Sequence, residues 1–371
     1  MAQGLLDARQ AFAVGDPVRA DQIAKEALQH LEAEPATDTE PARSRRAALG
    51  SALLAVRGGA AVRAGRLDDA LALFEKSRDQ AAVSDSASVI AAAALNLVDV
   101  WTHRGRHDAE DPLIEEASRV AAGGPYGDIL VKILLERGDA ATRAQAFGDA
   151  LALYDRAVAM RPAWPFPWYQ RAWARFLSGD ASGALDDFRE CAQRRQPFFT
   201  VLREIRCLED VAAGLLPLEA YRSYCRVREQ VRDRPGAVDE FAERLGAQHP
   251  DFAPAHLLRA EARLALGNVD GAREAVQEAL QHDPDPDTAA AALFVEWNLA
   301  RATADEASQR AVEQRLLEGY ADQPAAEIVK RLRGAGRREI KMRWTWALDG
   351  TFRLEEATPS HQGGGSPGGR H

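Results

Sequence analysis

Apolar and small residues recur at a fixed interval in the middle of the chain, between residues 131 and 197. A first set consists of Leu134, Gly138, Ala150, Tyr154 and Ala157. Exactly matched positions 34 residues later hold Trp168, Ala172, Ala184, Phe188 and Cys191. An interval of this length predicts a repeated pair of helices joined by a turn.

Weaker copies of the pattern extend in both directions. The segment Asp-Ala-Leu-Ala-Leu-Phe at 69–74 returns as Asp-Ala-Leu-Ala-Leu-Tyr at 149–154. Further helical hairpins are expected over the segments 1–34, 42–82, 86–122, 199–231, 253–284 and 287–319. An unpaired helix is expected at 236–248, and a short helix at 324–333 is expected to cap the array.

The central pair of hairpins resembles the tetratricopeptide repeat family. In that family's pattern, Ala150 and Ala184 let helices approach closely, Tyr154 and Phe188 fill the space between them, and Pro162 stops the second helix. The resemblance implies an all-α, right-handed superhelical solenoid of about eight tetratricopeptide-like helical hairpins. Repeat folds host many functions, so the function must be argued from the residues on their surfaces.

The pattern also divides the chain into segments. N-terminal repeats are expected at 1–122, central repeats at 123–232, and C-terminal repeats with the capping helix at 233–335. The unpaired helix and the turn-forming residues Asp233, Pro235 and Gly236 predict a bend near residue 235. Residues 358–371 are Gly-, Ser- and Pro-rich and are expected to be disordered.

Between residues 336 and 357 the period changes from that of a helix to that of a strand. A loop of Leu348, Asp349 and Gly350 would place Trp346 opposite Phe352 and Trp344 opposite Leu354. We therefore expect a small C-terminal β-hairpin with every apolar side chain on one face. A hairpin is marginal alone, so this face is expected to dock on the solenoid end, on a second subunit or on a partner.

Composition narrows the possible functions. The 371 residues carry a net charge of −9, which gives no reason to expect general binding to nucleic acid or to an anionic membrane. No charged-then-apolar leader opens the chain and no stretch is long enough to span a bilayer, so a cytoplasmic protein is expected. The cysteines Cys191, Cys207 and Cys225 lack metal or redox spacing, and Cys191 is expected in the core.

The sequence lacks the common catalytic and cofactor-binding motifs. The sequence holds no HExxH motif, phosphate-binding Gly-rich loop, GxSxG motif or Cys/His set with zinc spacing. Its isolated histidines beside turns are more often solvated or capping residues than ligands. We therefore expect no enzyme, no metal and no cofactor.

A repeat array does have a concave surface. The family resemblance implies that the first helix of each hairpin lines this groove, and that one residue of each points into it. The row consists of Arg9, Gly59, Asp99, Asp139, Trp173, Glu209, Glu261 and Glu296. Phe166, Tyr169 and Phe176 are expected on the same face as Trp173.

Aromatic rings flanked by carboxylates suit a peptide that bears Arg or Lys and one large apolar anchor. The alternative is that the acids only solvate Ala-rich helices and the aromatics pack in the core. The row departs from family members that use inward Lys and Asn residues to grip a carboxylate, which disfavours an acidic chaperone tail as partner.

A second candidate surface is basic. Its main residues are Arg337, Arg338, Lys341, Trp344 and Trp346, within and beside a basic segment at 330–343. Such a patch suits nucleic acid, an acidic protein or the acidic groove of another copy. Arg-rich helix ends also lie free in solvent without any partner.

These observations favour a non-catalytic adaptor or scaffold that holds a segment of a partner protein in its groove. Two alternatives remain open. One is a transcriptional or signalling regulator that uses the basic segment, and the other is a structural scaffold that self-associates through the C-terminal hairpin. The sequence does not identify the partner or the process.

Overall fold

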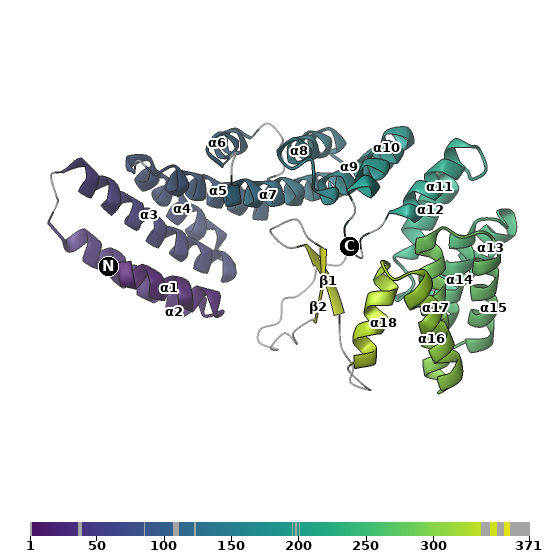
Figure 1. The fold of residues 1–371 in the computed structure, drawn as a ribbon. Coiled ribbons are helices and arrows are strands. Elements are labelled where there is room, and N and C mark those ends of the chain that lie inside the picture. The colour runs from purple at the N-terminus through teal and green to yellow at the C-terminus, as the bar shows by residue number, and fades with distance from the viewer. Residues whose placement is uncertain are drawn as a thin grey trace. The chain divides into compact units, whose positions relative to one another are not determined.

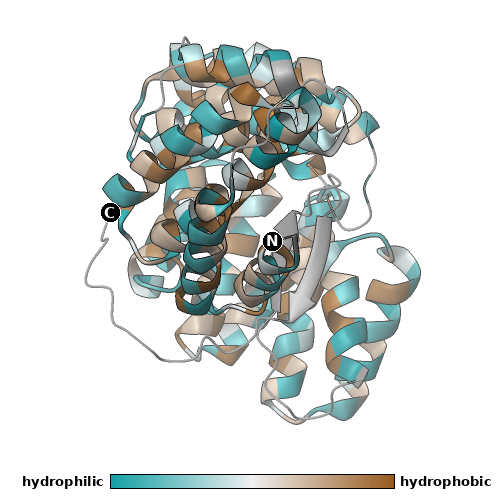
Figure 2. Cartoon of the chain, turned by 90° about the vertical axis from the view of Figure 1, so that its left-hand side faces the viewer, coloured by the Kyte–Doolittle hydropathy of each residue, from teal (hydrophilic) through white to brown (hydrophobic). Residues whose placement is uncertain are grey.

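The computed structural model describes residues 2–35, 39–84, 86–106, 111–121, 124–194, 196, 199, 201–334, 342–346 and 352–356. Apart from two short strands, the regular structure of these residues is entirely α-helical (Figure 1). Within each of the two units described below, consecutive helices stack as hairpins, the arrangement of an all-α solenoid. Hydrophobic and hydrophilic residues are interspersed along each helix (Figure 2), as expected for helices that bury one side only.

Two compact units divide the chain, Met1–Asp180 and Ala181–His371. The first unit holds α1 (Ala2–Ala13), α2 (Pro17–Ala33), α3 (Glu40–Arg63), α4 (Leu67–Val83), α5 (Ala87–His103), α6 (Pro112–Ala121), α7 (Gly124–Arg143), α8 (Phe147–Met160) and α9 (Pro165–Ser178). Consecutive helices pack as the expected hairpins, α1 on α2, α3 on α4, α5 on α6 and α7 on α8. The helical hairpins predicted at 1–34, 42–82 and 86–122 are therefore confirmed.

The second unit holds α10 (Ala181–Gln193), α11 (Leu202–Ala212), α12 (Leu218–Arg228), α13 (Pro235–Gln248), α14 (Ala253–Ala265), α15 (Val269–Gln281), α16 (Pro286–Ala302), α17 (Glu306–Gly319) and α18 (Pro324–Gly334). The hairpins α14/α15 and α16/α17 lie where the pattern predicts them. The helix expected at 324–333 is α18, which packs on α16 and α17 and buries Val329 against them.

Residues with a left-handed backbone follow the first helix of several hairpins. Gly15, Gly65 and Gly105 have φ angles of 87°, 71° and 84°, and glycine adopts this conformation without a Cβ clash. Gln145 holds the same place in the α7–α8 turn, with a φ of 59°. That position is costlier for a residue with a side chain.

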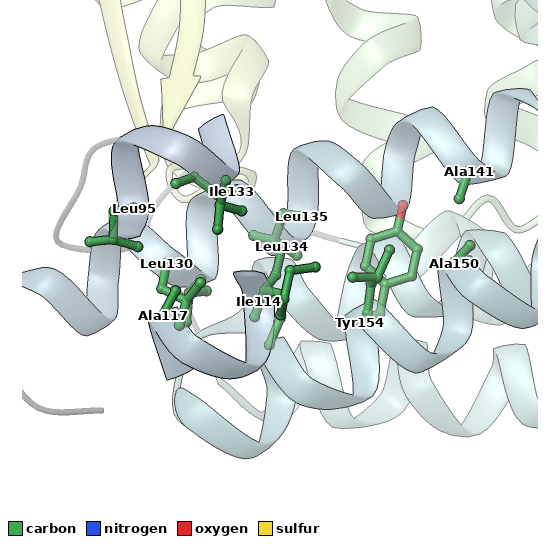
Figure 3. Packing of buried hydrophobic residues seen from close by; sticks show 14 of the residues in the cluster. Leu95, Ile114, Ala117, Leu130, Ile133, Leu134, Leu135, Ala141, Ala150 and Tyr154 are labelled. Carbon is green, nitrogen blue, oxygen red and sulfur yellow. The ribbon is translucent and has the colours of Figure 1, made fainter. Parts of the chain in front are cut away.

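The core of the first unit is densest around α5 to α8. Leu95, Leu130, Leu134 and Tyr154 are buried there (Figure 3). Each fully buried side chain of this size contributes about 1.5–3 kcal/mol. Since α5, α6, α7 and α8 all supply residues to this cluster, it joins two neighbouring hairpins.

One ion pair is buried in the same unit. Arg137 is 0% exposed, and its Nη1 donates to Asp111 Oδ2 over 2.8 Å. Its Nε donates to Thr102 Oγ1 over 2.6 Å, and its Nη2 donates to the carbonyl of Val98 over 3.2 Å. The guanidinium therefore joins α7 to α5 and to the residue that precedes α6.

In the second unit, one arginine connects helices far apart in sequence. The backbone N–H of Arg203, on α11, donates to Asp287 Oδ2 over 3.1 Å, and its Nε donates to Thr288 Oγ1 over 3.2 Å. Asp285 caps α16 by accepting from the backbone N–H groups of Asp287 and Thr288. The start of α11 is thereby fixed to the start of α16.

The strands β1 (Met342–Trp346) and β2 (Phe352–Glu356) pair antiparallel. Trp346 is opposite Phe352, and Trp344 is opposite Leu354. Arg337, Arg338, Lys341, the loop 347–351 and the expected tail 358–371 lie outside the described residues. The docking of this hairpin, the superhelical hand, the bend near 235 and the division at 122 and 232 stay predictions. None of the helices in the described ranges is long and apolar enough to cross a lipid bilayer.

Candidate functional site

Three first helices of the first unit, α5, α7 and α9, lie next to one another. Together they carry what we call the acid–aromatic face, formed by Asp99, Glu136, Asp139, Tyr169 and Trp173. Asp99, Asp139, Tyr169 and Trp173 were predicted from sequence. Glu136 was missed, although its spacing of three residues from Asp139 places both on one side of α7.

Asp139 joins two of these helices. Its Oδ1 accepts a hydrogen bond from Tyr154 Oη over 2.6 Å and another from Gln170 Nε2 over 2.6 Å. Burial raises the pKa of the Asp139 carboxyl, and the bond from Tyr154 lowers it in part. Burial also raises the pKa of Tyr154, and the charge of Asp139 raises it further. The hydroxyl therefore stays protonated and donates to the carboxylate.

The other two acids lie along the same face. Burial raises the pKa of Asp99, with opposing effects from His103 and Lys132. Burial raises the pKa of Glu136 as well, opposed by Lys132 and reinforced by the charge of Asp99. The face is therefore acidic without being uniformly so, because the charge of the exposed Lys132 acts on both Asp99 and Glu136.

Four aromatic rings follow one another along α9. Phe166 and Tyr169 stack with centroids 6.1 Å apart, and Tyr169 meets Trp173 edge-on at 6.2 Å. Trp173 meets Phe176 edge-on at 5.6 Å. Such contacts hold each ring in a fixed orientation.

Their burial separates these four rings into two kinds. Phe166, Tyr169 and Trp173 are half-buried, and Phe166 packs against the core cluster of the unit. Phe176 is 1% exposed, so its prediction as a partner-binding residue is wrong. Its helical spacing from Trp173 marked it for the groove, but the ring turns into the protein.

The predicted acids of the second unit have three separate environments. Glu209 is exposed and pairs with Arg189 over 2.8 Å. Glu296 is half-buried and pairs with Arg315 over 3.4 Å. Burial raises the pKa of Glu261, while the guanidinium groups of Arg203 and Arg228 lower it. Glu209 and Glu296 thus already have cations on neighbouring helices.

A cleft near Glu261 was not foreseen from sequence. It measures ≈ 350 Å³ and lies within the second unit, where α11, α12, α16 and α18 come together. Its polar lining includes Arg203, Glu204, Arg228 and Asp287. Each of these residues occupies a polar position of a helical pattern. Such positions usually predict a solvated helix face, so the sequence gives no local signal for the cleft.

The three cysteines of the second unit lie in environments that disfavour the thiolate. Burial raises the pKa of Cys191 and of Cys207, and it raises the pKa of Cys225 to about 11. These thiols are therefore protonated at neutral pH, whereas the thiolate is the reactive form. Within the ranges that the structure describes, no group of three or more His, Cys, Asp and Glu side chains is placed to hold a metal ion.

Stacked α-hairpins with a polar and aromatic face define a helical repeat protein. The model of the family described as tetratricopeptide repeat matches residues 235–294, which cover α13, α14, α15 and the first half of α16. Within this range the sequence is therefore similar to tetratricopeptide repeats. No curated protein matches it in sequence.

Solved structures with similar folds are distant in sequence. A tetratricopeptide repeat protein from Parabacteroides merdae ATCC 43184 is 15% identical with a TM-score of 0.30, over 89% of this chain and 96% of that one. YrrB, described as a TPR protein with an unusual peptide-binding site, is 14% identical with a TM-score of 0.28, over 63% of this chain and 86% of that one. PilF of Pseudomonas aeruginosa is 12% identical with a TM-score of 0.28, over 79% and 98%.

Proposed function

We propose that this chain is a protein-binding scaffold whose acid–aromatic face holds a segment of a partner protein. The tetratricopeptide repeat fold supports the coarser part of this proposal, a role in protein–protein interaction. The contact between Asp139 and Gln170 carries the finer part, because it joins the acids of α7 to the aromatic rings of α9.

The chemistry of the face suits a cationic side chain. Oδ1 of Asp139 accepts two hydrogen bonds, so Oδ2 remains the oxygen through which this carboxylate can accept from a ligand. A guanidinium has several donors in one plane and also stacks on aromatic rings. Hydrogen bonds to charged groups contribute about 1.5–3 kcal/mol, and a cation over an aromatic ring contributes about 0.5–2 kcal/mol.

The mechanism is preorganisation. Tyr154 and Gln170 hold Asp139, and the ring contacts along α9 orient Tyr169 and Trp173. The receptor therefore loses little side-chain freedom when the segment binds, and most of the ordering cost falls on the ligand. A partner segment with an Arg or Lys and an apolar anchor fits this face, and no catalytic step is required.

The remaining parts of the proposal extend beyond this face. Glu209, Glu261 and Glu296 stay predicted contacts for the partner, and a cytoplasmic location stays a prediction. A nucleic-acid regulator is not favoured, because the chain carries a net charge of −9. Arg337, Arg338 and Lys341 lie outside the described residues, so their role stays a prediction. Self-association through Trp344 and Trp346 stays a prediction.

Affinity purification with mass spectrometry tests the proposal. Proteins that co-purify with the wild type are compared with those retained by Asp139→Asn and Trp173→Ala. Asparagine keeps an oxygen for Tyr154 and Gln170 but removes the charge, so the fold is preserved. Glu75→Gln, an exposed acid on the second helix α4, is the matched control.

We expect Glu75→Gln to retain the partners of the wild type and both face variants to lose them. Equal melting temperatures must accompany the comparison, so that loss of partners is not loss of fold. The same partners on all four proteins would remove the acid–aromatic face as the binding site.

A further inference from the structure

The cleft of the second unit has two chemically different walls. Phe294 of α16 and Pro324, Ala325 and Ile328 at the start of α18 form an apolar wall. Arg203 and Glu204 at the start of α11, with Arg228 at the end of α12, form a polar wall. A cleft of ≈ 350 Å³ lies at the lower end of the range for ligand sites, about 300–1,000 Å³.

Arg203 and Asp287 of the cleft lining already make hydrogen bonds within the protein. Arg203 donates through Nε to Thr288 Oγ1 and through Nη2 to the carbonyl of Asp287. Asp287 in turn accepts from the backbone N–H of Arg203. These bonds join α11 to α16, so they fix the shape of the cleft and leave these two residues less able to engage a ligand.

The side chains of Glu204 and Arg228 have no such hydrogen bonds in the described ranges. Glu204 is 8% exposed, lines the cleft, and accepts no hydrogen bond from another residue in the part of the chain described. The guanidinium of Arg228 makes no hydrogen bond or ion pair within the same described ranges, and it lies 5.9 Å from the ring centroid of Tyr224. A buried carboxyl such as Glu204 is normally hydrogen-bonded, so a ligand that donates to it and accepts from the half-buried Arg228 would complete this wall.

The charged groups that line the cleft disfavour ligands of high net charge. Two guanidinium groups, Arg203 and Arg228, face two carboxyl groups, Glu204 and Asp287. An anionic ligand would meet the two carboxylates, and a cationic one would meet the two guanidiniums. A peptide group is uncharged and carries an acceptor C=O and a donor N–H, which match Arg228 and Glu204 respectively.

We propose that this cleft is a second binding site, separate from the acid–aromatic face, which takes an extended, uncharged and apolar peptide segment of a partner protein. Main-chain amides of the segment accept from Arg228 and donate to Glu204. One apolar side chain packs against Phe294 and Ile328. The site discriminates against Asp, Glu, Lys and Arg at that position because both carboxyl and guanidinium groups line it.

Capped tetrapeptides are the probes for this site. The full chain is titrated by isothermal calorimetry with acetyl-Ala-Leu-Ala-Ala-amide and with the same peptide carrying Glu or Arg in place of Leu. Arg228→Met removes the donors, while Arg226→Met, which changes an exposed arginine two residues earlier on α12, is the matched control.

We expect saturable binding of the Leu peptide to the wild type and to Arg226→Met, and binding at least about tenfold weaker to Arg228→Met, which corresponds to about 1.4 kcal/mol. The Glu and Arg peptides are expected to bind about tenfold more weakly than the Leu peptide. Tighter binding of either charged peptide would overturn the proposal, and so would no binding of the Leu peptide up to about 10 mM. Either result would leave the proposal for the acid–aromatic face unaffected, because that face belongs to the first unit.

Discussion

At the scale of single residues, two glycines make room for aromatic rings between the helices of a hairpin. A Cβ added to Gly138 would lie 2.4 Å from Cε1 of Tyr154, and one added to Gly58 would lie 2.4 Å from Cε1 of Phe74. In both hairpins the ring belongs to the residue 16 positions after the glycine. The space that a side chain on the first helix would occupy is thus filled by an aromatic ring of the second helix.

Replacing Gly138 by alanine tests this packing. Since the ring of Tyr154 is buried and cannot move freely, we expect Gly138→Ala to lower the free energy of unfolding by about 1–3 kcal/mol. Gly148→Ala on α8 is the matched control, because nothing lies within 4 Å of the added Cβ. There we expect no loss, and a gain of up to about 1 kcal/mol from helix propensity. The free energy of unfolding of both variants is measured by urea denaturation. An equal change in the two variants would contradict the packing argument.

The buried ion pair of Arg137 with Asp111 gives a second prediction at this scale. Arg137→Met would leave the Asp111 carboxylate, which is 1% exposed, without its closest cation. We expect a loss of about 3–5 kcal/mol in urea denaturation, because an uncompensated buried charge is costly. Arg310→Met is the control, since its pair with Glu306 is 77% and 80% exposed and is worth about 0–1 kcal/mol. A loss below that of the control would show that Arg106, 3.3 Å from Asp111, replaces the pair.

Helix positions could be predicted from sequence because each hairpin carries its signals locally. Gly65 follows α3, the first helix of its hairpin, and the 34-residue interval places Ala150 and Tyr154 on α8, the second helix of theirs. The pair of Arg137 with Asp111 could not be predicted in this way. Its partners are 26 residues apart, and charged residues at helical spacing usually indicate a solvated face.

The candidate site shows the same limit. Trp173 and Asp139 could be predicted because they occupy corresponding positions of two repeats. Phe176 was assigned to the same face by spacing, yet its ring is buried. Arg228 and Glu204 were missed, since a cleft between α12 and α16 depends on contacts that the repeat interval does not encode.

At the scale of helical elements, two carboxyl groups between α11, α12 and α14 make stability depend on pH. Burial raises the pKa of both Glu204 and Glu261, although Arg203 and Arg228 lower it in part. Between the unfolded value, about 4.3, and the raised folded value, the folded chain binds more protons than the unfolded chain. The contribution of these groups to stability therefore falls as pH rises through this window.

Urea midpoints measured from about pH 4 to pH 8 test this sign. In the double variant Glu204→Gln/Glu261→Gln, we expect the decline with rising pH to be shallower than in the wild type. It should not vanish, because burial also raises the pKa of Asp99, Glu136 and Asp139. A steeper decline in the double variant would mean that the two carboxyls are better stabilised as anions in the folded chain than in water.

At the scale of the whole molecule, the division into two units falls between α9 and α10. That boundary lies inside the strongest sequence repeat, residues 131–197, so the repeat interval alone does not predict it. Compactness of the second unit depends on long-range bonds such as that from Arg203 to Asp287, 84 residues apart. A repeat interval reports which helices form hairpins, and such bonds decide which hairpins form a unit.

Stability in such an array is expected to be local, because each hairpin packs mainly on its neighbours. Tyr154→Ala removes a buried ring and its bond to Asp139, at a cost of about 3–5 kcal/mol. Native-state hydrogen exchange should then show loss of protection in α7 and α8 and unchanged protection in α14 to α17. Leu316→Ala, at a residue of α17 that is 0% exposed, should give the reverse pattern, with loss in α16 to α18. Uniform loss along the chain in either variant would mean that the solenoid unfolds as one cooperative body.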